Sequence, residues 1–143
     1  MSSPSSPGRG VLDTSVVILL PRIIRAGCLP DEPVITTVTL AELAAGPHVA
    51  GDDAERARRQ AQVQLAESTF VALPFDEAAA RAFGPVAASL RRSGRKRSAR
   101  AFDALIAAIA VANGLAVHTA NPSDFEGIDG LEVVALVPEE LRA

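Results

Sequence analysis

The sequence predicts an α/β fold, a three-layer sandwich in which helices flank a mostly parallel central sheet. Apolar, β-branched runs alternate with helical segments along the 143 residues, and such strand–helix–strand units form right-handed crossovers. The apolar fraction of 48% is that of a folded globule, and the length is typical of one compact domain. We therefore expect a single domain over residues 10–143, preceded by a short flexible leader over residues 1–9.

The first part of the chain predicts two strands and a helix. Residues 10–20 open with a short apolar stretch that meets an acid at Asp13, a pattern typical of a buried strand whose end is functional. Prolines and a glycine interrupt residues 21–33. Residues 34–38 form a β-branched run that predicts a strand, and residues 39–46 predict a helix that is closed by a glycine.

Two longer helices are predicted in the middle of the chain. Residues 52–68 are rich in Ala, Gln, Arg and Glu and contain no helix breaker, whereas residues 70–75 alternate like a short strand. Residues 76–92 predict the next helix. Gly84 and Pro85 should divide or kink it, because proline removes a backbone donor and clashes with the preceding turn.

The last part of the chain contains the strongest predicted helix, at residues 99–113, which ends before Gly114. Residues 115–119 and 132–136 predict two further strands. No apolar stretch reaches the roughly 20 residues that a membrane-spanning helix needs, and the leader lacks the apolar segment of a secretory signal. We therefore expect a cytoplasmic protein that does not bind membranes.

Basic residues are distributed unevenly along the chain. The net charge of −3 disfavours binding of nucleic acid through overall attraction, yet six of the 14 basic residues fall within ten consecutive positions. These residues are Arg91, Arg92, Arg95, Lys96, Arg97 and Arg100. The cluster predicts a phosphate-binding surface that leads into the helix at residues 99–113. A solvated loop and an acceptor for an acidic partner segment remain the alternatives.

Acidic and amide side chains lie near the predicted carboxyl ends of several strands. Asp13 follows the first strand, Glu42 lies one helical turn past the second, and Asp103 lies in the first turns of the strongest helix. Asn121 and Asp124 follow the strand at residues 115–119. Binding sites in open α/β sheets form beyond these strand ends. Because Mg²⁺ takes oxygen ligands and would relieve the repulsion between neighbouring carboxylates, the set predicts a metal site.

Each acid also has a structural interpretation when it is considered alone. Asp13 could cap the helix that follows it. Glu42 follows Thr39 at the spacing of a capping box, in which the glutamate binds the threonine amide. Asp103 could complement a helix N-terminus, and Asp124 could be a turn residue. The metal site is therefore predicted by the set and not by any one member.

Four segments of the chain resemble, in order and spacing, the successive motifs of PIN-domain toxins of the VapC type. The segments are Val11–Val16, Thr39–Leu43, Phe102–Ala108 and Thr119–Phe125. The resemblance covers essentially everything after the leader. It implies an endoribonuclease that cleaves structured RNA of the transfer or ribosomal class with one or two Mg²⁺ or Mn²⁺ ions. It also implies a small VapB-type antitoxin that holds the enzyme inactive, a homodimer, and a toxin–antitoxin hetero-oligomer.

The resemblance assigns roles to individual residues of this chain. Asp13 and Asp103 match the two best-defined metal-binding acids, and Glu42 matches the third. Thr14 or Ser15 matches the hydroxyl that often supports the site. The implied mechanism is hydrolytic: the ion activates water and offsets charge on the phosphoryl oxygens, while the carboxylates mainly hold the ion. The basic cluster would then contact RNA phosphates.

The chain departs from the family pattern at the fourth acid. Many relatives have it two residues after the threonine, where this chain has Asn121. Either Asn121 supplies a neutral oxygen or the role passes to Asp124, which we favour because a carboxylate can accept a proton and an amide cannot. Two other functions remain open: a housekeeping RNA-processing nuclease of the same fold, and a module that binds RNA or protein without catalysis.

Overall fold

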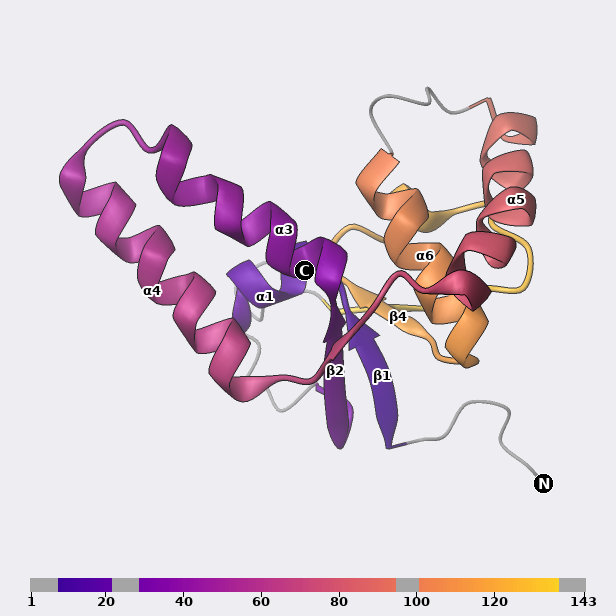
Figure 1. The fold of residues 1–143 in the computed structure, drawn as a ribbon. Helices are drawn as coiled ribbons and strands as arrows, with labels where there is room; N and C mark the ends of the chain where they lie inside the picture. Colours follow the sequence, from indigo (N-terminus) through magenta and orange to yellow (C-terminus); the bar gives the residue numbers. More distant parts are fainter. Residues whose placement is uncertain (1–7, 22–28, 95–100, 137–143) are drawn as a thin grey trace, which may run out of the picture.

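The computed structural model describes residues 8–21, 29–94 and 101–136, so most of the expected leader and four members of the basic cluster lie outside the described residues. Five parallel strands form one sheet with the order β3-β2-β1-β4-β5 (Figure 1). The strands are β1 (Arg9–Leu12), β2 (Glu32–Thr36), β3 (Ala72–Leu73), β4 (Val117–Thr119) and β5 (Val133–Ala135). Val11 at the centre is in register with Val34 on one side and Val117 on the other. The predicted parallel sheet is confirmed.

Helices connect the strands and cover both faces of the sheet. The α-helices are α1 (Thr14–Ile18), α3 (Thr37–Ala45), α4 (Asp53–Thr69), α5 (Glu77–Arg92) and α6 (Ala101–Asn113), and the 3-10 helices are η1 (Gly46–Val49) and η3 (Pro122–Phe125). Val11 and Val34 join a core with α5 and α6, whereas their neighbours Leu12 and Ile35 join a second core with α1, α3 and α4. This alternation is expected where successive side chains point to opposite faces of a strand. No helix of the described segments is long and apolar enough to cross a membrane.

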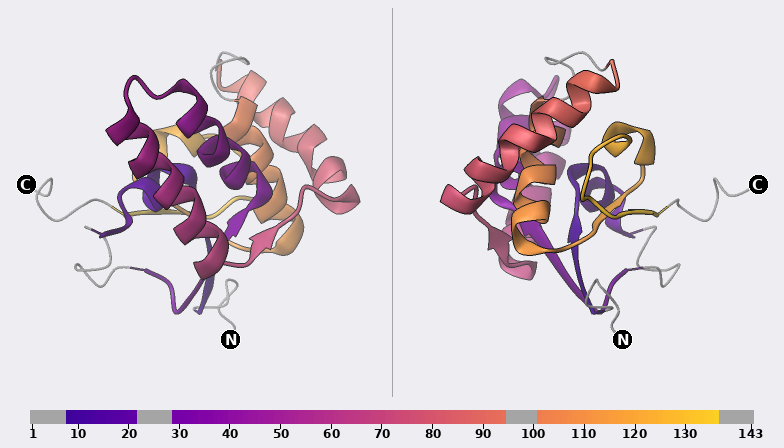
Figure 2. Two further views of the ribbon diagram at one scale, coloured as in Figure 1. Left: turned by 60° about the vertical axis from the view of Figure 1, so that its left-hand side comes forward. Right: turned by 90° about the vertical axis from the view of Figure 1, so that its right-hand side faces the viewer.

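The helices form two pairs that extend from the sheet. In all views α5 and α6 lie side by side, and α3 and α4 form an antiparallel hairpin joined through η1 (Figures 1 and 2). Only Val63 and Ala66 of α4 are buried, near the end of the helix that approaches β3. The far part of the α3–α4 hairpin is therefore stabilised by surface contacts instead of by the core.

The start of α3 differs from the prediction. Strand β2 ends at Thr36, and the helix begins at Thr37, two residues before the predicted start. The Thr36 hydroxyl caps the helix by accepting a 3.1 Å hydrogen bond from the Thr39 amide. The capping box between Thr39 and Glu42 is therefore wrong, because Thr39 lies inside the helix and the glutamate carboxylate has a different partner. Helix α3 ends at Gly46 as expected, although Gly46 has a right-handed φ of −55° and the chain continues into η1.

Helix α5 runs as one helix from Glu77 to Arg92, so of the two predicted effects of Gly84 and Pro85 the division is wrong, and the kink stays a prediction. Both residues are exposed, and the carbonyl that loses its donor to Pro85 belongs to Arg81, which is also exposed. Water can satisfy that carbonyl, while Val86 and Leu90 hold the other side of the helix against the core. At the end of α6, Gly114 adopts a φ of +67°, which confirms the predicted glycine stop.

Candidate active site

Asp13 is the first residue after β1 and is 3% exposed. Its Oδ1 accepts hydrogen bonds from the Val16 amide at 3.1 Å and from the Ser15 hydroxyl at 2.7 Å. Its Oδ2 accepts from the Thr119 hydroxyl at 2.6 Å. The bond from Val16 makes Asp13 the N-cap of α1, so the structural role left open by the sequence is confirmed. The remaining donors come from side chains, and they fix the carboxylate at the strand end.

The hydroxyls that hold Asp13 are themselves anchored to the end of β4. The Ser15 hydroxyl accepts from the Ala120 amide at 3.1 Å, and the Thr119 hydroxyl accepts from the Asn121 amide at 2.9 Å. Ser15 thus orients the Asp13 carboxylate, and Asn121 contributes its backbone amide to the same network. Thr119 was not among the predicted site residues. Its position at the end of the strand beside β1 is the signal that could have identified it.

Glu42 is half-buried on α3 and faces α1. The Thr14 hydroxyl donates to Glu42 Oε1 at 2.5 Å, and it lies 3.0 Å from the Thr39 hydroxyl. Because a hydroxyl carries a single hydrogen, Thr14 accepts from Thr39 while it donates to the carboxylate. Thr14 therefore orients the Glu42 carboxylate, and Thr39 is a second hydroxyl of this network that the sequence analysis did not identify.

The acids influence one another electrostatically. Burial raises the pKa of Asp13, and its hydrogen bonds with Thr119, Ser15 and Val16 oppose that rise only in part; the charge of Asp124 raises it further. Burial also raises the pKa of Glu42, the Thr14 hydrogen bond lowers it, and the charge of Asp13 raises it. Both carboxylates thus lie where negative charge is disfavoured, and a cation between them would reverse that effect.

Asp103 and Asp124 lie on two other elements. Asp103 is partly buried in the first turn of α6, and Asp124 is partly buried in η3. Helix α6 contacts both α3 and η3. The charge of Asp124 reaches Asp13, whereas the convergence of Asp103 on the same site stays a prediction. In the part of the chain that is described, no three acids, histidines or cysteines are close enough to form a complete metal-binding cluster.

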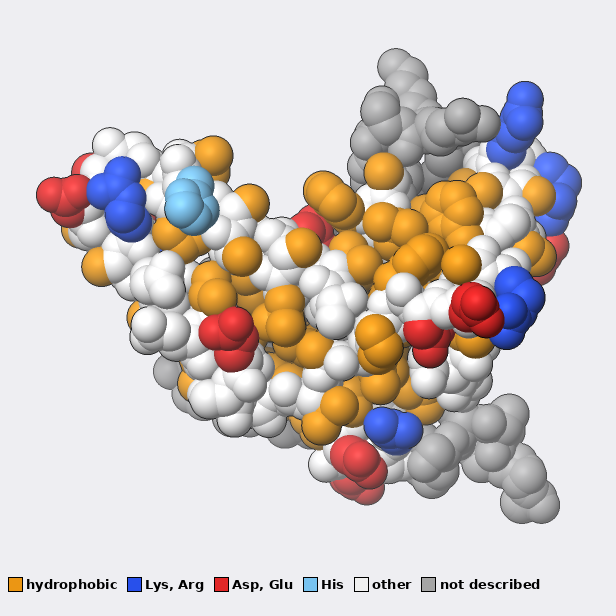
Figure 3. All heavy atoms as spheres, in the orientation of Figure 1, with side chains coloured by type: hydrophobic (Ala, Val, Ile, Leu, Met, Phe, Trp, Pro, Cys, Tyr) orange, Lys and Arg blue, Asp and Glu red, His pale blue; other side chains and the backbone are white. Residues whose placement is uncertain are grey.

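The donor set nonetheless fits a divalent ion by its chemistry. Asp13 and Glu42 offer oxygens only, they are partly or wholly withdrawn from water, and they repel each other. Oxygen ligands of this kind suit Mg²⁺ and Mn²⁺. In Figure 3 the surface is indented between the α3–α4 hairpin and α6, and a small acidic patch is visible at the base of the indentation. The donor chemistry of Asp13 and Glu42 suits a divalent ion, and the predicted four-acid metal site stays a prediction.

The family model described as a PIN domain matches residues 10–131 of the chain. The chain belongs to the PIN-domain family. Two relatives are named as VapC ribonucleases of Mycobacterium tuberculosis. Ribonuclease VapC5 is 36% identical over 93% of this chain and 97% of the relative, and ribonuclease VapC8 is 38% identical over 72% and 91%.

Solved structures agree with this placement of the PIN domain. The VapBC-5 toxin–antitoxin structure from Mycobacterium tuberculosis matches with a TM-score of 0.76 and 35% identity, over 90% of this chain and 99% of the matched chain. A DNA-bound VapBC structure from Salmonella typhimurium matches with a TM-score of 0.70 and 28% identity, over 87% and 96%. The predicted three-layer α/β fold and the VapC-type resemblance are therefore confirmed.

A pocket of about 460 Å³ lies beside the Thr14–Glu42 hydrogen bond of this PIN domain. Its walls come from α1, α3 and α4, and the residues that line it are Thr14, Ile18, Glu42, Leu43, Gly46, Glu55, Arg58, Arg59 and Gln62. The site therefore continues from the acids at the strand ends to a basic wall on the α3–α4 hairpin. The sequence analysis did not assign a role to that wall.

The basic cluster predicted from the sequence is described only at Arg91 and Arg92, while Arg95, Lys96, Arg97 and Arg100 lie outside the described residues. Arg92 donates to the Asp129 carboxylate at 2.6 Å and to the Ser89 hydroxyl at 3.3 Å. It therefore ties the end of α5 to the loop before β5. The predicted contact of the cluster with RNA stays a prediction.

Proposed function

We propose that this PIN domain is a metal-dependent endoribonuclease and acts as the toxin of a toxin–antitoxin pair. The observation that carries the proposal is Asp13: a buried carboxylate, held by neutral donors only, beside Glu42 and within the electrostatic influence of Asp124. Capping α1 requires only Asp13, and the fold gains no stability from the arrangement of neighbouring acids, because their carboxylates repel one another. It is the arrangement that a divalent ion needs. The relatives named as ribonucleases support the same activity.

The four acids of the proposed site and the hydroxyls beside them have different roles. Asp13, Glu42, Asp103 and Asp124 would hold one or two Mg²⁺ ions, with Mn²⁺ as the alternative. When bound, such an ion supplies a Lewis acid toward water and the scissile phosphate. Thr119 and Ser15 keep the Asp13 carboxylate oriented, and Thr14 does the same for Glu42. Asp124 is the carboxylate that can accept the proton of the attacking water, whereas the Asn121 amide cannot.

The proposed substrate is a structured RNA of the transfer or ribosomal class, and the proposed place of action is the cytoplasm, where such RNA is found. The proposed partner is a small VapB-type antitoxin, because the matched structures are toxin–antitoxin complexes and one of them is bound to DNA. The antitoxin would dock an apolar segment and direct a basic residue toward the acids, where it competes with the metal ion. A homodimer of this chain would bind antitoxins as a hetero-oligomer.

Cleavage of total tRNA and of ribosomal RNA by the purified chain tests the activity. We expect cleavage with Mg²⁺ or Mn²⁺, no cleavage in excess EDTA, and recovery when Mg²⁺ is restored. Asp103→Asn serves as the inactive control. Cleavage that persists in EDTA would show that the metal dependence is wrong. A folded chain that leaves both RNA classes intact would instead be a binding module. A purified complex with the antitoxin should cleave more slowly than the free chain, and equal rates would exclude inhibition.

A further inference from the structure

Three arginines follow one another closely on α4, and they have different partners. Arg56 donates through Nε to the Pro47 carbonyl at 3.2 Å and through an Nη to Asp53 at 2.8 Å. Arg59 donates to the Gly46 carbonyl at 2.9 Å and to Glu55 Oε2 at 2.8 Å. Each therefore binds a backbone carbonyl of η1. These two side chains join the halves of the α3–α4 hairpin.

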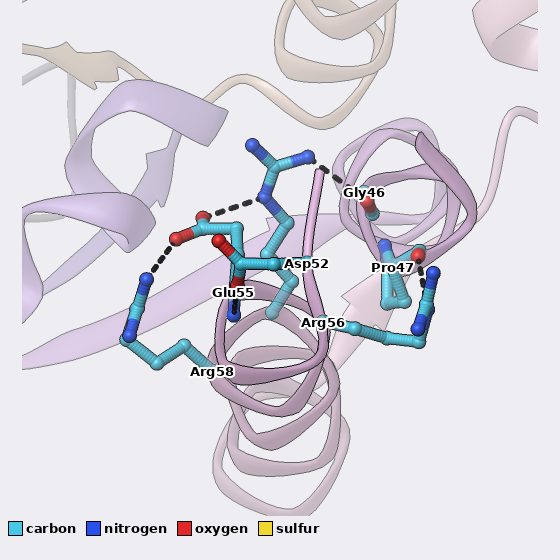
Figure 4. A network of polar contacts seen from close by, with 7 residues as sticks. Gly46, Pro47, Asp52, Glu55, Arg56 and Arg58 are labelled. Atoms are coloured by element: carbon cyan, nitrogen blue, oxygen red, sulfur yellow. Dashed lines mark hydrogen bonds and ion pairs between the residues drawn. The ribbon is translucent and has the colours of Figure 1, made fainter. Parts of the chain in front are cut away.

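Arg58 has no such structural role among the contacts of the described residues. Its hydrogen bond to Glu55 Oε1 is made within α4, and its side chain is 67% exposed. Figure 4 shows Arg56 and Arg58 leaving α4 on opposite sides, with Arg56 directed toward Pro47 and Glu55 lying between them. Arg58 lines the pocket that also contains Thr14 and Glu42. It thus offers a guanidinium group to that pocket without supporting the fold.

Glu55 can release Arg58 at little cost. Its carboxylate is shared, with Oε1 bound to Arg58 and Oε2 bound to Arg59. When Arg58 turns away, Arg59 still neutralises the carboxylate and still binds the Gly46 carbonyl. The Arg58–Glu55 ion pair is weak, because water and salt screen the charges of an exposed pair. The arrangement therefore keeps Arg58 ready to bind an anion that enters the pocket.

We propose that Arg58 is a substrate-binding residue that grips an RNA phosphate next to the one that is cleaved. The proposal rests on the proposed ribonuclease activity of the site. The pocket adjoins Glu42, so a nucleotide that enters it is linked through the chain to the phosphate at the acids. Its volume, about 460 Å³, lies in the range of pockets that enclose small ligands and admits a nucleotide-sized group. The exposed Ile18 in the same pocket gives an apolar surface for a ribose or base.

The chemistry of the two walls favours a phosphate as the ligand. The planar guanidinium fork matches two phosphate oxygens, and arginine recognises phosphate for this reason. A polyanion that approaches Glu42 and Asp13 meets their negative charge first, so a cation on the opposite wall offsets that repulsion. A carboxylate from the antitoxin is the competing ligand. RNA is favoured because the pocket is lined by Glu42, one of the proposed catalytic acids.

Three variants test the proposal on the full chain. Arg58→Gln removes the cation, and Arg58→Lys keeps the charge but loses the fork. Arg81→Gln is the matched control, because Arg81 is 72% exposed, pairs with Glu77 on its own helix at 3.5 Å, and does not line the pocket. Thermal unfolding of each variant confirms that the fold is retained. The readouts are KM and kcat for cleavage of total tRNA in Mg²⁺, and the salt dependence of binding to fluorescent poly(U) in EDTA.

For Arg58→Gln we expect KM to rise about tenfold with kcat unchanged, since a hydrogen bond to a charged group is worth at least a tenfold change in affinity. The slope of the logarithm of the poly(U) binding constant against the logarithm of the salt concentration should flatten by about 0.7. This is the value for one lost phosphate contact on a single strand. Arg58→Lys should keep the parent slope and recover part of the KM. Arg81→Gln should behave like the parent in both measurements.

Several outcomes would overturn the proposal. Arg58→Gln could keep the parent KM and salt slope, or it could lower kcat while KM stays unchanged. It could also weaken only the binding of the antitoxin. The last result would assign the pocket to the protein partner. A parent chain that fails to cleave tRNA in Mg²⁺ would count against the proposed ribonuclease function instead. The poly(U) titration needs no cleavage, so it decides the role of Arg58 separately.

Discussion

The end of β1 and the start of α4 each hold a carboxylate among several donors, but in opposite surroundings. Asp13 is buried and accepts only from neutral groups, two hydroxyls and an amide, and its pKa is raised because burial outweighs those bonds. Glu55 lies between Arg58 and Arg59, and their hydrogen bonds lower its pKa. The two sites show that donor charge and burial, more than donor number, determine whether a carboxylate still attracts a cation.

The largest effect in this comparison should come from neutralising the buried site. We expect Asp13→Asn or Asp103→Asn to abolish RNA cleavage, a loss of at least about a hundredfold, which is the range for removing one group that stabilises transition-state charge. The fold should remain intact or become more stable, because one charge leaves a repelling cluster. Cleavage assays and thermal unfolding measure the two effects. Asp53→Asn on α4, where the side chain is exposed, is the control. If the site variants lost cooperative unfolding, Asp13 and Asp103 would be needed for the fold and not for catalysis.

The next effect concerns the neutral donors around Asp13. Thr119→Val should destabilise the fold by about 1–3 kcal/mol, because it leaves Asp13 Oδ2 and the Asn121 amide without the buried hydroxyl that binds both. Thr119→Ser keeps the hydroxyl, so its loss of stability should be much smaller. Urea unfolding of the two variants gives the difference. If the Thr119→Val and Thr119→Ser variants were equally stable, Thr119 would contribute to stability by its packing and not by its hydrogen bonds.

The sequence predicted the parts of the structure that depend on local patterns. Alternating apolar runs predicted the parallel sheet, and the position of Asp13 after the first run predicted an acid at a strand end. Thr119 was missed because its partner Asp13 lies 106 positions away, and no local pattern marks such a contact. The start of α3 was misplaced because Thr36 and Thr39 are both plausible caps, and the choice between them depends on where β2 leaves the sheet.

A smaller effect is expected from the basic cluster, whose cations should supply affinity for RNA but not the choice of cleavage site. A variant that keeps Arg92, which binds Asp129, should retain the fold and the cleavage site when the rest of the cluster is neutralised. The neutralised residues are Arg91, Arg95, Lys96, Arg97 and Arg100. Each lost phosphate contact should flatten the logarithmic salt slope by about 0.7. A variant that kept the parent slope and lost antitoxin binding would place the cluster in the partner interface.

The smallest expected effect tests the exposed half of the comparison. Because the folded pKa of Glu55 lies below its unfolded value, its arginine pairs contribute stability that is fully present above the unfolded pKa and is lost as the pH falls through the folded pKa. Glu55→Gln should therefore lower stability slightly at neutral pH and low salt, and the difference from the parent should vanish in strong acid or in high salt. Urea unfolding over a pH series measures it. Glu77→Gln, which breaks the looser 3.5 Å pair on α5, is the control and should change stability less. A Glu55→Gln deficit that persisted unchanged in high salt and acid would show that the carboxylate acts through hydrogen bonding to the hairpin and not through its charge.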